Sequence, residues 1–146
     1  VLFYICKTQK YHRICSLQFT VFFFFPYIKL FKQVPSIFKS IDAAHSRLGC
    51  PYVWGGNGPN TFDCSGLVKW CYAQVGISIP RTTGELKSYG TQISVSQALP
   101  GDILWKSGHV GIYIGNGQYI HAPQTGDVVK ISSVSGSGFV CAVRVK

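Results

Sequence analysis

The sequence predicts an α+β domain in which helices come first and an antiparallel sheet follows. Two segments with apolar residues at helical spacing, 36–48 and 64–75, occupy the first part of the domain. From residue 103 onward, short runs of β-branched and aromatic residues are separated by turn residues, as is typical of antiparallel strands. Because helices and strands are segregated along the chain, the pattern favours an α+β fold over alternating parallel units.

The first predicted helix begins at Ser36, a good N-cap residue, and ends before Gly49. Its apolar face consists of residues at helical spacing: Ile37, Phe38, Ile41, Ala44 and Leu48. A loop rich in Gly, Pro and Asn follows and carries Tyr52 and Trp54. These aromatic side chains indicate either one wall of a cleft or ordinary aromatic packing.

Cys64 lies where this loop enters the second predicted helix. Asp63 before it is a favourable N-cap residue, and Gly76 provides a C-terminal stop. The face expected to be buried contains Leu67, Val68, Cys71, Tyr72 and Val75. In the first turn of a helix, unpaired N–H groups and the helix dipole favour a thiolate. Cys64 is therefore a candidate nucleophile, although a cysteine here also fits simple packing.

The chain after the second helix is harder to interpret until residue 98. Residues 80–83 are expected to be a connector, and the polar residues that follow, through Ser96, show no clear pattern. A turn at 98–102 then introduces the predicted strands. They lie at 103–105, in two arms of a hairpin within 108–122, at 127–131 and at 139–145, with a Ser/Gly-rich turn at 132–138.

The register of the hairpin decides whether His109 and His121 can act together. A two-residue loop at 116–117 would place the histidines on opposite faces of the sheet. A three-residue loop at 115–117 with a G1 bulge would place Gly111 opposite His121 and both histidines on one face. A catalytic pair requires the second register. Otherwise each histidine is an ordinary, half-exposed strand residue.

The composition indicates a folded protein without a nucleic-acid partner. The chain has 146 residues, of which 47% are hydrophobic and 13% charged, enough for one domain with a real core. The net charge is +9, but six of the fourteen Lys and Arg residues, and no acid, lie in residues 1–41. Since no recognisable nucleic-acid motif accompanies this charge, we expect no nucleic acid among its partners.

Residues 1–35 are expected to form a basic and apolar leader that precedes the domain. A basic stretch at 7–13 and an apolar run at 14–25 follow the order of a secretory signal. No clear cleavage site follows, and the apolar run is short for a membrane-spanning helix. The alternatives are an incomplete export signal, a non-native leader and an integral part of the fold. Membrane contact is expected only if the leader is retained.

The cysteines do not predict a disulfide framework or a zinc site. They show no compact spacing and no C-x-x-C pair: Cys6, Cys15, Cys50, Cys64, Cys71 and Cys141. A chain of this size and hydrophobicity does not need disulfides for stability. We expect Cys71 and Cys141 in the core, Cys50 in a loop or in packing, and no metal or other cofactor.

Six ordered sequence blocks resemble the NlpC-type cell-wall cysteine peptidases. They are PYVWGG at 51–56, FDCSGL at 62–67, PRT at 80–82, LPGD at 99–102, GHVGIY at 108–113 and IHA at 120–122. The similarity covers about residues 36–146, the expected catalytic domain. It implies a papain-like fold and hydrolysis of peptides in bacterial peptidoglycan. Most members of that family cut the bond between D-γ-glutamyl and a diamino acid.

The same resemblance assigns expected roles to individual residues. Cys64 is the nucleophile, His109 the general base and then the acid, and His121 orients His109. The backbone N–H of Cys64 and the Tyr52 hydroxyl are expected to stabilise the oxyanion. Further expected substrate contacts are Trp54 as a cleft wall, Asp63 and Ser65 at the polar end of the stem peptide, and Arg81 with a substrate carboxylate. For Arg81, a structural salt bridge is an equally good interpretation.

Other functions remain open beside the endopeptidase. A papain-like amidase that cuts between the glycan and L-alanine would use the same triad. A non-catalytic wall-binding module would keep the cleft but lose Cys or His, whereas here Cys64, His109 and His121 are all present. A papain-like lipid acyltransferase usually has its histidine ahead of its cysteine, the reverse of the order here. A peptidoglycan substrate implies a secreted or wall-associated protein.

Overall fold

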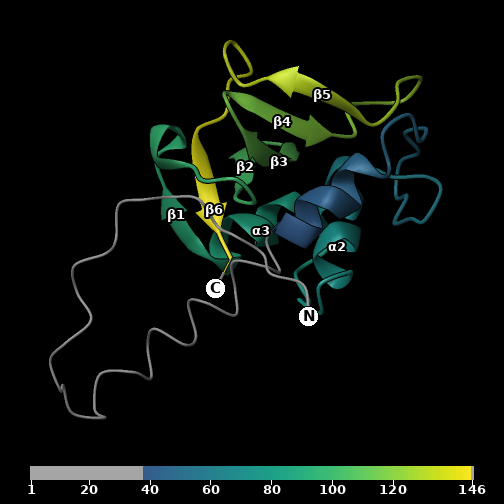
Figure 1. Cartoon of the computed structure of the whole chain (residues 1–146), viewed down its shortest axis with the longest axis horizontal. Coiled ribbons are helices and arrows are strands. Elements are labelled where there is room, and N and C mark those ends of the chain that lie inside the picture. The colour runs from purple at the N-terminus through teal and green to yellow at the C-terminus, as the bar shows by residue number, and fades with distance from the viewer. Residues whose placement is uncertain (1–37, 146) are drawn as a thin grey trace, which may run out of the picture.

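The computed structural model describes residues 38–145. Within this part of the chain, helices pack against a curved, six-stranded antiparallel sheet (Figure 1). The predicted order of helices before an antiparallel sheet is confirmed. The leader over 1–35, the cap at Ser36, Ile37 and the cysteines Cys6 and Cys15 lie outside the described residues.

The first helix is described over residues 38–45 and is followed by a turn over 46–49. Ile41 and Ala44 are buried in the core, as predicted. The predicted apolar face is too long, because Phe38 is 57% and Leu48 41% exposed. Leu48 leaves that face because the helix has already ended, and Gly49 closes the turn at φ +82°. Only the middle of the predicted face therefore packs.

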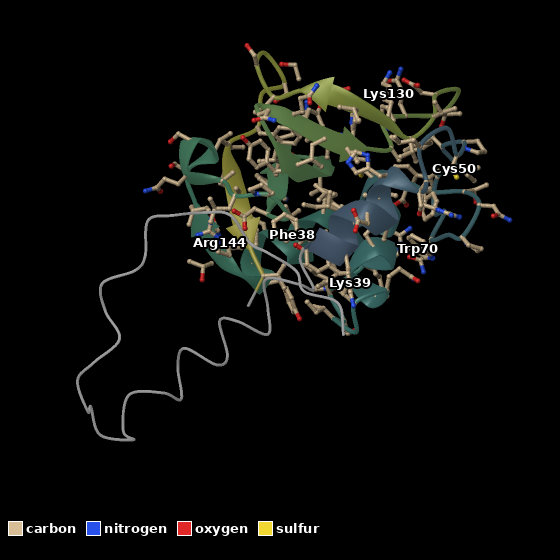
Figure 2. The ribbon with its side chains drawn as sticks, viewed as in Figure 1. Phe38, Lys39, Cys50, Trp70, Lys130 and Arg144 are labelled. Carbon is tan, nitrogen blue, oxygen red and sulfur yellow. The ribbon has the colours of Figure 1, made fainter. Side chains whose placement is uncertain are left out.

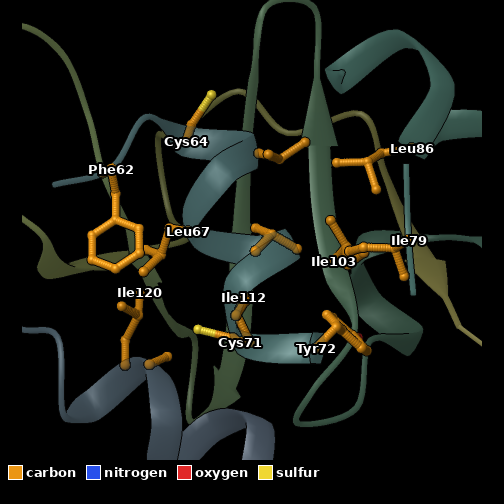
Figure 3. Packing of buried hydrophobic residues seen from close by; sticks show 14 of the residues in the cluster. Phe62, Cys64, Leu67, Cys71, Tyr72, Ile79, Leu86, Ile103, Ile112 and Ile120 are labelled. Carbon is orange, nitrogen blue, oxygen red and sulfur yellow. The ribbon is translucent and has the colours of Figure 1, made fainter. Parts of the chain in front are cut away.

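Helix α2 (Cys64–Ala73) is the central helix of the domain. The Asp63 carboxylate caps it by accepting a hydrogen bond of 2.7 Å from the N–H of Gly66. Four residues of the predicted face are buried, namely Leu67, Val68, Cys71 and Tyr72. Figure 3 shows this face packing against Ile103, Ile112 and Ile120 of three neighbouring strands. The predicted cap and these four core positions are confirmed, but Val75 is only half-buried, because the helix ends at Ala73, before this residue.

The polar segment without a clear pattern contains helix α3 (Thr83–Tyr89), strand β1 (Thr91–Ile93) and a 3₁₀ turn (Val95–Gln97). Thr82 and Glu85 form a capping box at the start of α3. Their spacing, Thr-x-x-Glu, is a signal that the sequence analysis missed. Leu86 is the one residue of this helix that is buried.

The remaining strands are β2 (Ile103–Lys106), β3 (His109–Gly115), β4 (Gln118–His121), β5 (Lys130–Ser133) and β6 (Cys141–Arg144). The order across the sheet is β1-β6-β2-β3-β4-β5, and every neighbouring pair is antiparallel. Helix α2 lies against β3 and β4, and α3 lies against β6 and β1 (Figure 1). Among residues 38–145, no helix is long and apolar enough to cross a membrane.

The hairpin between β3 and β4 combines a two-residue turn with a bulge. Asn116 and Gly117 form the turn, with φ of +52° and +68°, and Gly115 faces Gln118. The predicted three-residue loop is therefore wrong. A shift in pairing between Tyr113 and Gly115 nevertheless changes the register beyond the turn. The shift restores the register that places both histidines on one face.

Strand β5 begins and ends later than predicted, and this moves Ser132 out of the expected turn. The predicted strand covered 127–131, whereas β5 is Lys130–Ser133 and pairs Ser132 with Tyr119 of β4. The error arose because serines and glycines over 132–138 were all interpreted as turn residues. Two of the serines continue the strand instead.

The described cysteines, Cys50, Cys64, Cys71 and Cys141, are all free thiols. Cys71 is fully buried in the core, as predicted. Cys141 is only half-buried, so its predicted core position is wrong. It is the first residue of β6, at the strand end, where less of the sheet covers it. Cys50 lies in the loop after the first helix and packs against the edge of the core (Figure 2).

Candidate active site

Cys64 is the first residue of α2 and lies against the start of β3. Its Sγ is 4.0 Å from the carbonyl oxygen of Gly108, and the backbone N–H of Val110 acts to lower the pKa of the thiol. His109 is the residue between these two contacts. Figure 3 shows the sulfur pointing away from the packed side chains of α2. The helix start and the strand start therefore bring the candidate nucleophile and base together.

Burial raises the pKa of the Cys64 thiol, and the charge of Asp63 raises it further. Backbone N–H groups, that of Val110 first, favour the thiolate but do not outweigh burial. The expectation that the helix start favours a thiolate is therefore wrong in its net direction. Desolvation of the sulfur exceeds the effect of the helix end, so the resting side chain is a neutral thiol.

His109 and His121 meet side by side on neighbouring strands. His109 begins β3 and His121 ends β4, and His109 Nε2 lies 2.8 Å from His121 Nδ1. Their rings are 5.0 Å apart, centroid to centroid, and nearly perpendicular at 76°. This geometry is a direct hydrogen bond between the imidazoles. The two histidines therefore share a face, as a catalytic pair requires.

The hydrogen-bond chain continues from His121 to a residue that the sequence analysis missed. His121 Nε2 lies 2.9 Å from the Oγ of Ser132 on β5. Ser132 is paired with Tyr119 across the strands, and its hydroxyl acts to lower the pKa of the Tyr119 phenol. The only available signal was the alternation of a strand over 130–133, which the wrong strand boundary concealed.

Both histidines are held neutral near pH 7. Burial, and then the charge of Lys106, lower the pKa of His109 to about 4. Burial, then His109 and Lys130, lower the pKa of His121 to about 4, with Asp127 acting in the opposite direction. A neutral imidazole has a free lone pair and can accept a proton. At neutral pH, His109 is thus in the state that a general base needs.

Two aromatic rings pack behind the histidines. Phe139 stacks on His109, with centroids 6.2 Å apart and an angle of 19° between the rings. Tyr119 packs on His121 at 4.5 Å and meets Phe139 edge-on at 4.8 Å. These contacts restrict rotation of both imidazoles, because each ring has a neighbour on one face. They also provide much of the burial that lowers the two pKa values.

Tyr52 lies close enough to Cys64 for the two groups to interact electrostatically. Burial, followed by the charges of Cys64 and Asp63, raises the pKa of the Tyr52 hydroxyl, so it stays protonated. The backbone of Tyr52 is fixed by a bridge to Phe62 and by its N–H, which donates to the Asp127 carbonyl at 2.8 Å. A protonated phenol beside the thiol is a suitable hydrogen-bond donor for an oxyanion.

Asp63 and Arg81 form a part-buried ion pair that joins three segments. Arg81 Nη2 lies 2.6 Å from Asp63 Oδ2, and Nη1 donates to Ser65 Oγ at 2.8 Å. The same carboxylate accepts from the N–H groups of Gly55 and Gly66. Burial alone would raise the pKa of Asp63, but the hydrogen bonds from Arg81 and Gly66 outweigh it and lower the pKa. The structure thus contains the salt bridge that was the alternative role of Arg81.

Trp54 is 85% exposed and lies in the loop that leads to the Asp63 cap. Ordinary aromatic packing is therefore the wrong interpretation of this side chain, because most of the ring contacts no other residue. Among residues 38–145, no group of three or more His, Cys, Asp or Glu side chains is arranged to hold a metal ion.

Residues 49–144 match the model of the NlpC/P60 family, which is about two thirds of the chain. The chain belongs to the NlpC/P60 family. It is 52% identical over 104 residues to the probable endopeptidase p60 of Listeria monocytogenes, covering 68% of this chain and 21% of that protein. It is 47% identical over 107 residues to a probable endopeptidase of Corynebacterium glutamicum, covering 71% of this chain and 51% of that protein.

Solved NlpC/P60 domains share the fold. The crystal structure of the NlpC/p60 domain of the peptidoglycan hydrolase SagA superposes with a TM-score of 0.70 at 46% identity, covering 75% of this chain and 98% of that chain. The predicted papain-like fold is confirmed by this NlpC/P60 neighbour. The chain spans about a fifth of the Listeria relative and half of the Corynebacterium relative.

Within this NlpC/P60 domain, the structure brings together most of the residues singled out from the sequence. Cys64, His109 and His121 meet where α2 approaches β3, with Tyr52 beside them. A second hydrogen-bonded cluster lies at the N-terminus of α2 and consists of Asp63, Ser65 and Arg81. Catalytic and substrate-binding roles for these residues stay predictions.

Proposed function

We propose that this NlpC/P60 domain, residues 36–146, is a cysteine endopeptidase that cuts the D-γ-glutamyl–diamino acid bond in peptidoglycan stem peptides. One observation carries the proposal: the Cys64 thiol lies against the strand start that presents His109, and His109 is hydrogen-bonded to His121. The names of the relatives, probable endopeptidases and a peptidoglycan hydrolase, support the same class of reaction.

The first half of the reaction forms an acyl-enzyme. His109 Nε2 is engaged by His121, so Nδ1 is the nitrogen that takes the thiol proton. As it does so, the Cys64 sulfur attacks the scissile carbonyl carbon and a C–S bond forms. The Cys64 N–H and the Tyr52 hydroxyl then donate to the oxyanion. The proton on His109 passes to the leaving amine as the C–N bond breaks.

The second half returns the enzyme to its starting state. A water molecule gives a proton to His109 Nδ1 and attacks the thioester carbon. The C–S bond breaks, the proton returns to the sulfur, and the new carboxyl group leaves. His121 holds the His109 ring in place through both halves. No step requires a cofactor.

Four side chains are proposed to bind the substrate around this centre. Trp54 offers an exposed ring as a wall of the binding site. Asp63 and Ser65 are proposed to meet the polar end of the stem peptide, with the Asp63 charge kept ionised by Arg81. Arg81 acts mainly by fixing this carboxylate. The substrate also implies action outside the cell or at the wall, with residues 1–35 as a leader.

Product analysis by mass spectrometry tests the proposal. The full chain and its Cys64→Ala variant are incubated with digested peptidoglycan, intact wall and L-Ala-γ-D-Glu-diaminopimelate. We expect L-Ala-γ-D-Glu from the parent protein alone, because the variant lacks the nucleophile. The Cys71→Ala variant is a control, since Cys71 is a buried core thiol.

Two results would overturn the proposal. Release of stem peptides that begin with L-alanine from intact wall would instead identify the amidase. Unchanged substrates under reducing conditions at several pH values would favour a wall-binding module.

A further inference from the structure

We propose that Ser132 is a positioning residue that selects the tautomer of His121 and thereby keeps Nδ1 of His109, the nitrogen proposed to accept the thiol proton, free of a proton. The hydrogen-bond chain from His109 through His121 to Ser132 is the observation behind it. Its catalytic consequence rests on the proposed function, whereas the tautomer itself does not.

A histidine in the orienting position has an ambiguity that a carboxylate lacks. A carboxylate only accepts hydrogen bonds, but a neutral imidazole carries its proton on either Nδ1 or Nε2. If His121 holds the proton on Nδ1, it donates to His109 Nε2. His109 must then carry its own proton on Nδ1 and cannot accept another there. Only the Nε2–H tautomer of His121 leaves His109 able to act as a base.

Ser132 supplies an acceptor for that tautomer. Its Oγ lies 2.9 Å from His121 Nε2, and His121 is buried with 7% exposure, so little water can replace it. The Ser132 proton can point toward the Tyr119 phenol on the paired strand, whose pKa the hydroxyl acts to lower. The donors of the chain then point one way, from His109 through His121 to Ser132. Without the hydroxyl, the Nε2–H would be a buried donor with no acceptor, which disfavours that tautomer.

Strand pairing holds Ser132 in this position. Ser132 lies directly opposite Tyr119, the residue two before His121, so all three side chains share one face of the sheet. The neighbouring Ser133 is exposed and lies opposite Gln118. Ser133 therefore has the same chemistry on the same strand without the contact to His121. It is a matched control position.

Charged groups around His121 are the same in all serine variants. Lys130 and Lys106 lower its pKa and Asp127 raises it, beside the effect of His109. None of these residues is altered by a change at 132 or 133. A difference in tautomer or kcat between the variants therefore reports the loss of the Ser132 hydroxyl and not a change in the surrounding charge.

The test uses the full chain with ¹⁵N-labelled histidine and the variants Ser132→Ala, Ser132→Thr and Ser133→Ala. Imidazole ¹⁵N shifts at neutral pH, where both rings are neutral, report the tautomers. We expect Nε2–H at His109 and His121 in the parent protein and a shift of His121 toward Nδ1–H in Ser132→Ala. Ser132→Thr restores a hydroxyl and should return the parent spectrum, and Ser133→Ala should not alter it. Identical spectra for Ser132→Ala and the parent would overturn the proposal.

Hydrolysis of the tripeptide gives the second readout. We expect kcat of Ser132→Ala to fall about tenfold with KM unchanged, in line with about 1.4 kcal/mol of lost stabilisation. Ser132→Thr should recover most of the loss. Equal losses in the Ala and Thr variants would assign Ser132 a purely structural role and overturn the proposal. If the parent hydrolyses nothing while the tautomer still shifts, the proposed function fails and the role of Ser132 stands.

Discussion

Cys64 is buried and His109 is half-buried, and desolvation shifts their pKa values in opposite directions. It raises that of the thiol and lowers that of the imidazole, so both groups are neutral before substrate binds. These shifts favour a neutral thiol and a neutral imidazole over a thiolate–imidazolium pair. In the proposed reaction, proton transfer to His109 would accompany attack of the sulfur on the carbonyl, and the rate is expected to depend on His109 being unprotonated.

The pH profile of hydrolysis should report this shifted imidazole. The pKa of His109 is lowered to about 4, compared with about 6.5 for an ordinary histidine. We expect kcat/KM to stay constant as the pH falls through 6.5 and to decrease only as the pH approaches about 4. Lys106→Gln should move this decline upward by about a few tenths of a pH unit, since the Lys106 charge lowers the His109 pKa.

Lys87→Gln is the control for that charge, because Lys87 lies over the Trp105 ring and does not affect His109. The measurement is the initial rate of tripeptide hydrolysis by the parent protein and both lysine variants, at a series of acidic pH values. A decline of the parent protein near 6.5 would show that an ordinary histidine, not a buried one, limits the rate.

At the scale of elements, the start of α2 is fixed by close contact with the preceding loop. Gly66 lies so near this loop that an added Cβ would be 2.0 Å from the Gly56 carbonyl oxygen. The N–H of Gly66 meanwhile donates to the Asp63 cap. The position of Cys64 thus depends on a glycine whose missing side chain lets loop and helix touch.

Gly66→Ala should therefore destabilise the domain. We expect the free energy of unfolding to fall by about 1 to 3 kcal/mol or more, because a backbone carbonyl cannot move aside cheaply. Gly84→Ala on α3 is the matched control, since its Cβ would meet nothing within 4 Å. That change should leave stability within about 1 kcal/mol of the parent, on the stabilising side. Urea denaturation measures both, and equal stabilities would contradict the close contact.

The sequence predicts an element well where a periodic apolar face and a capping residue coincide. It predicts poorly where pairing between strands sets the register or the strand ends. Helix α2 has both an N-cap at Asp63 and a periodic apolar face, so its position and core were predictable. The bulge between Tyr113 and Gly115 was not, because one extra residue in a strand leaves no mark in the alternation. Ser132 was missed because Ser and Gly predict turns locally, whereas pairing with β4 extends the strand through it.

At the scale of the whole molecule, the two histidines couple folding to pH. Both have a pKa of about 4 in the folded protein and about 6.5 when unfolded. Between these values the unfolded chain binds protons that the folded protein does not, so acid favours unfolding. Their contribution to stability is present above pH 6.5 and is lost as pH falls through about 4.

We expect the free energy of unfolding to fall by about a few kcal/mol over this pH range. The double variant His109→Gln, His121→Gln should show a flatter dependence because it removes both groups. His45→Gln, on the exposed end of the first helix, should leave the dependence as in the parent. The free energies of unfolding of the parent protein and the variants are compared by urea denaturation at a series of pH values. A parent curve that is flat in this window would contradict the buried, neutral state of the pair.

The place of β6 in the sheet also bears on how the domain is made. This strand, Cys141–Arg144, lies between β1 and β2, and within residues 38–145 it is the one strand that pairs with β1. Ala142 and Val143 of β6 are fully buried. While a ribosome is still translating the preceding residues, the sheet lacks its link between β1 and the hairpin that carries the histidines. The domain is therefore expected to complete its sheet, and to gain the proposed hydrolase activity, only after β6 has left the exit tunnel.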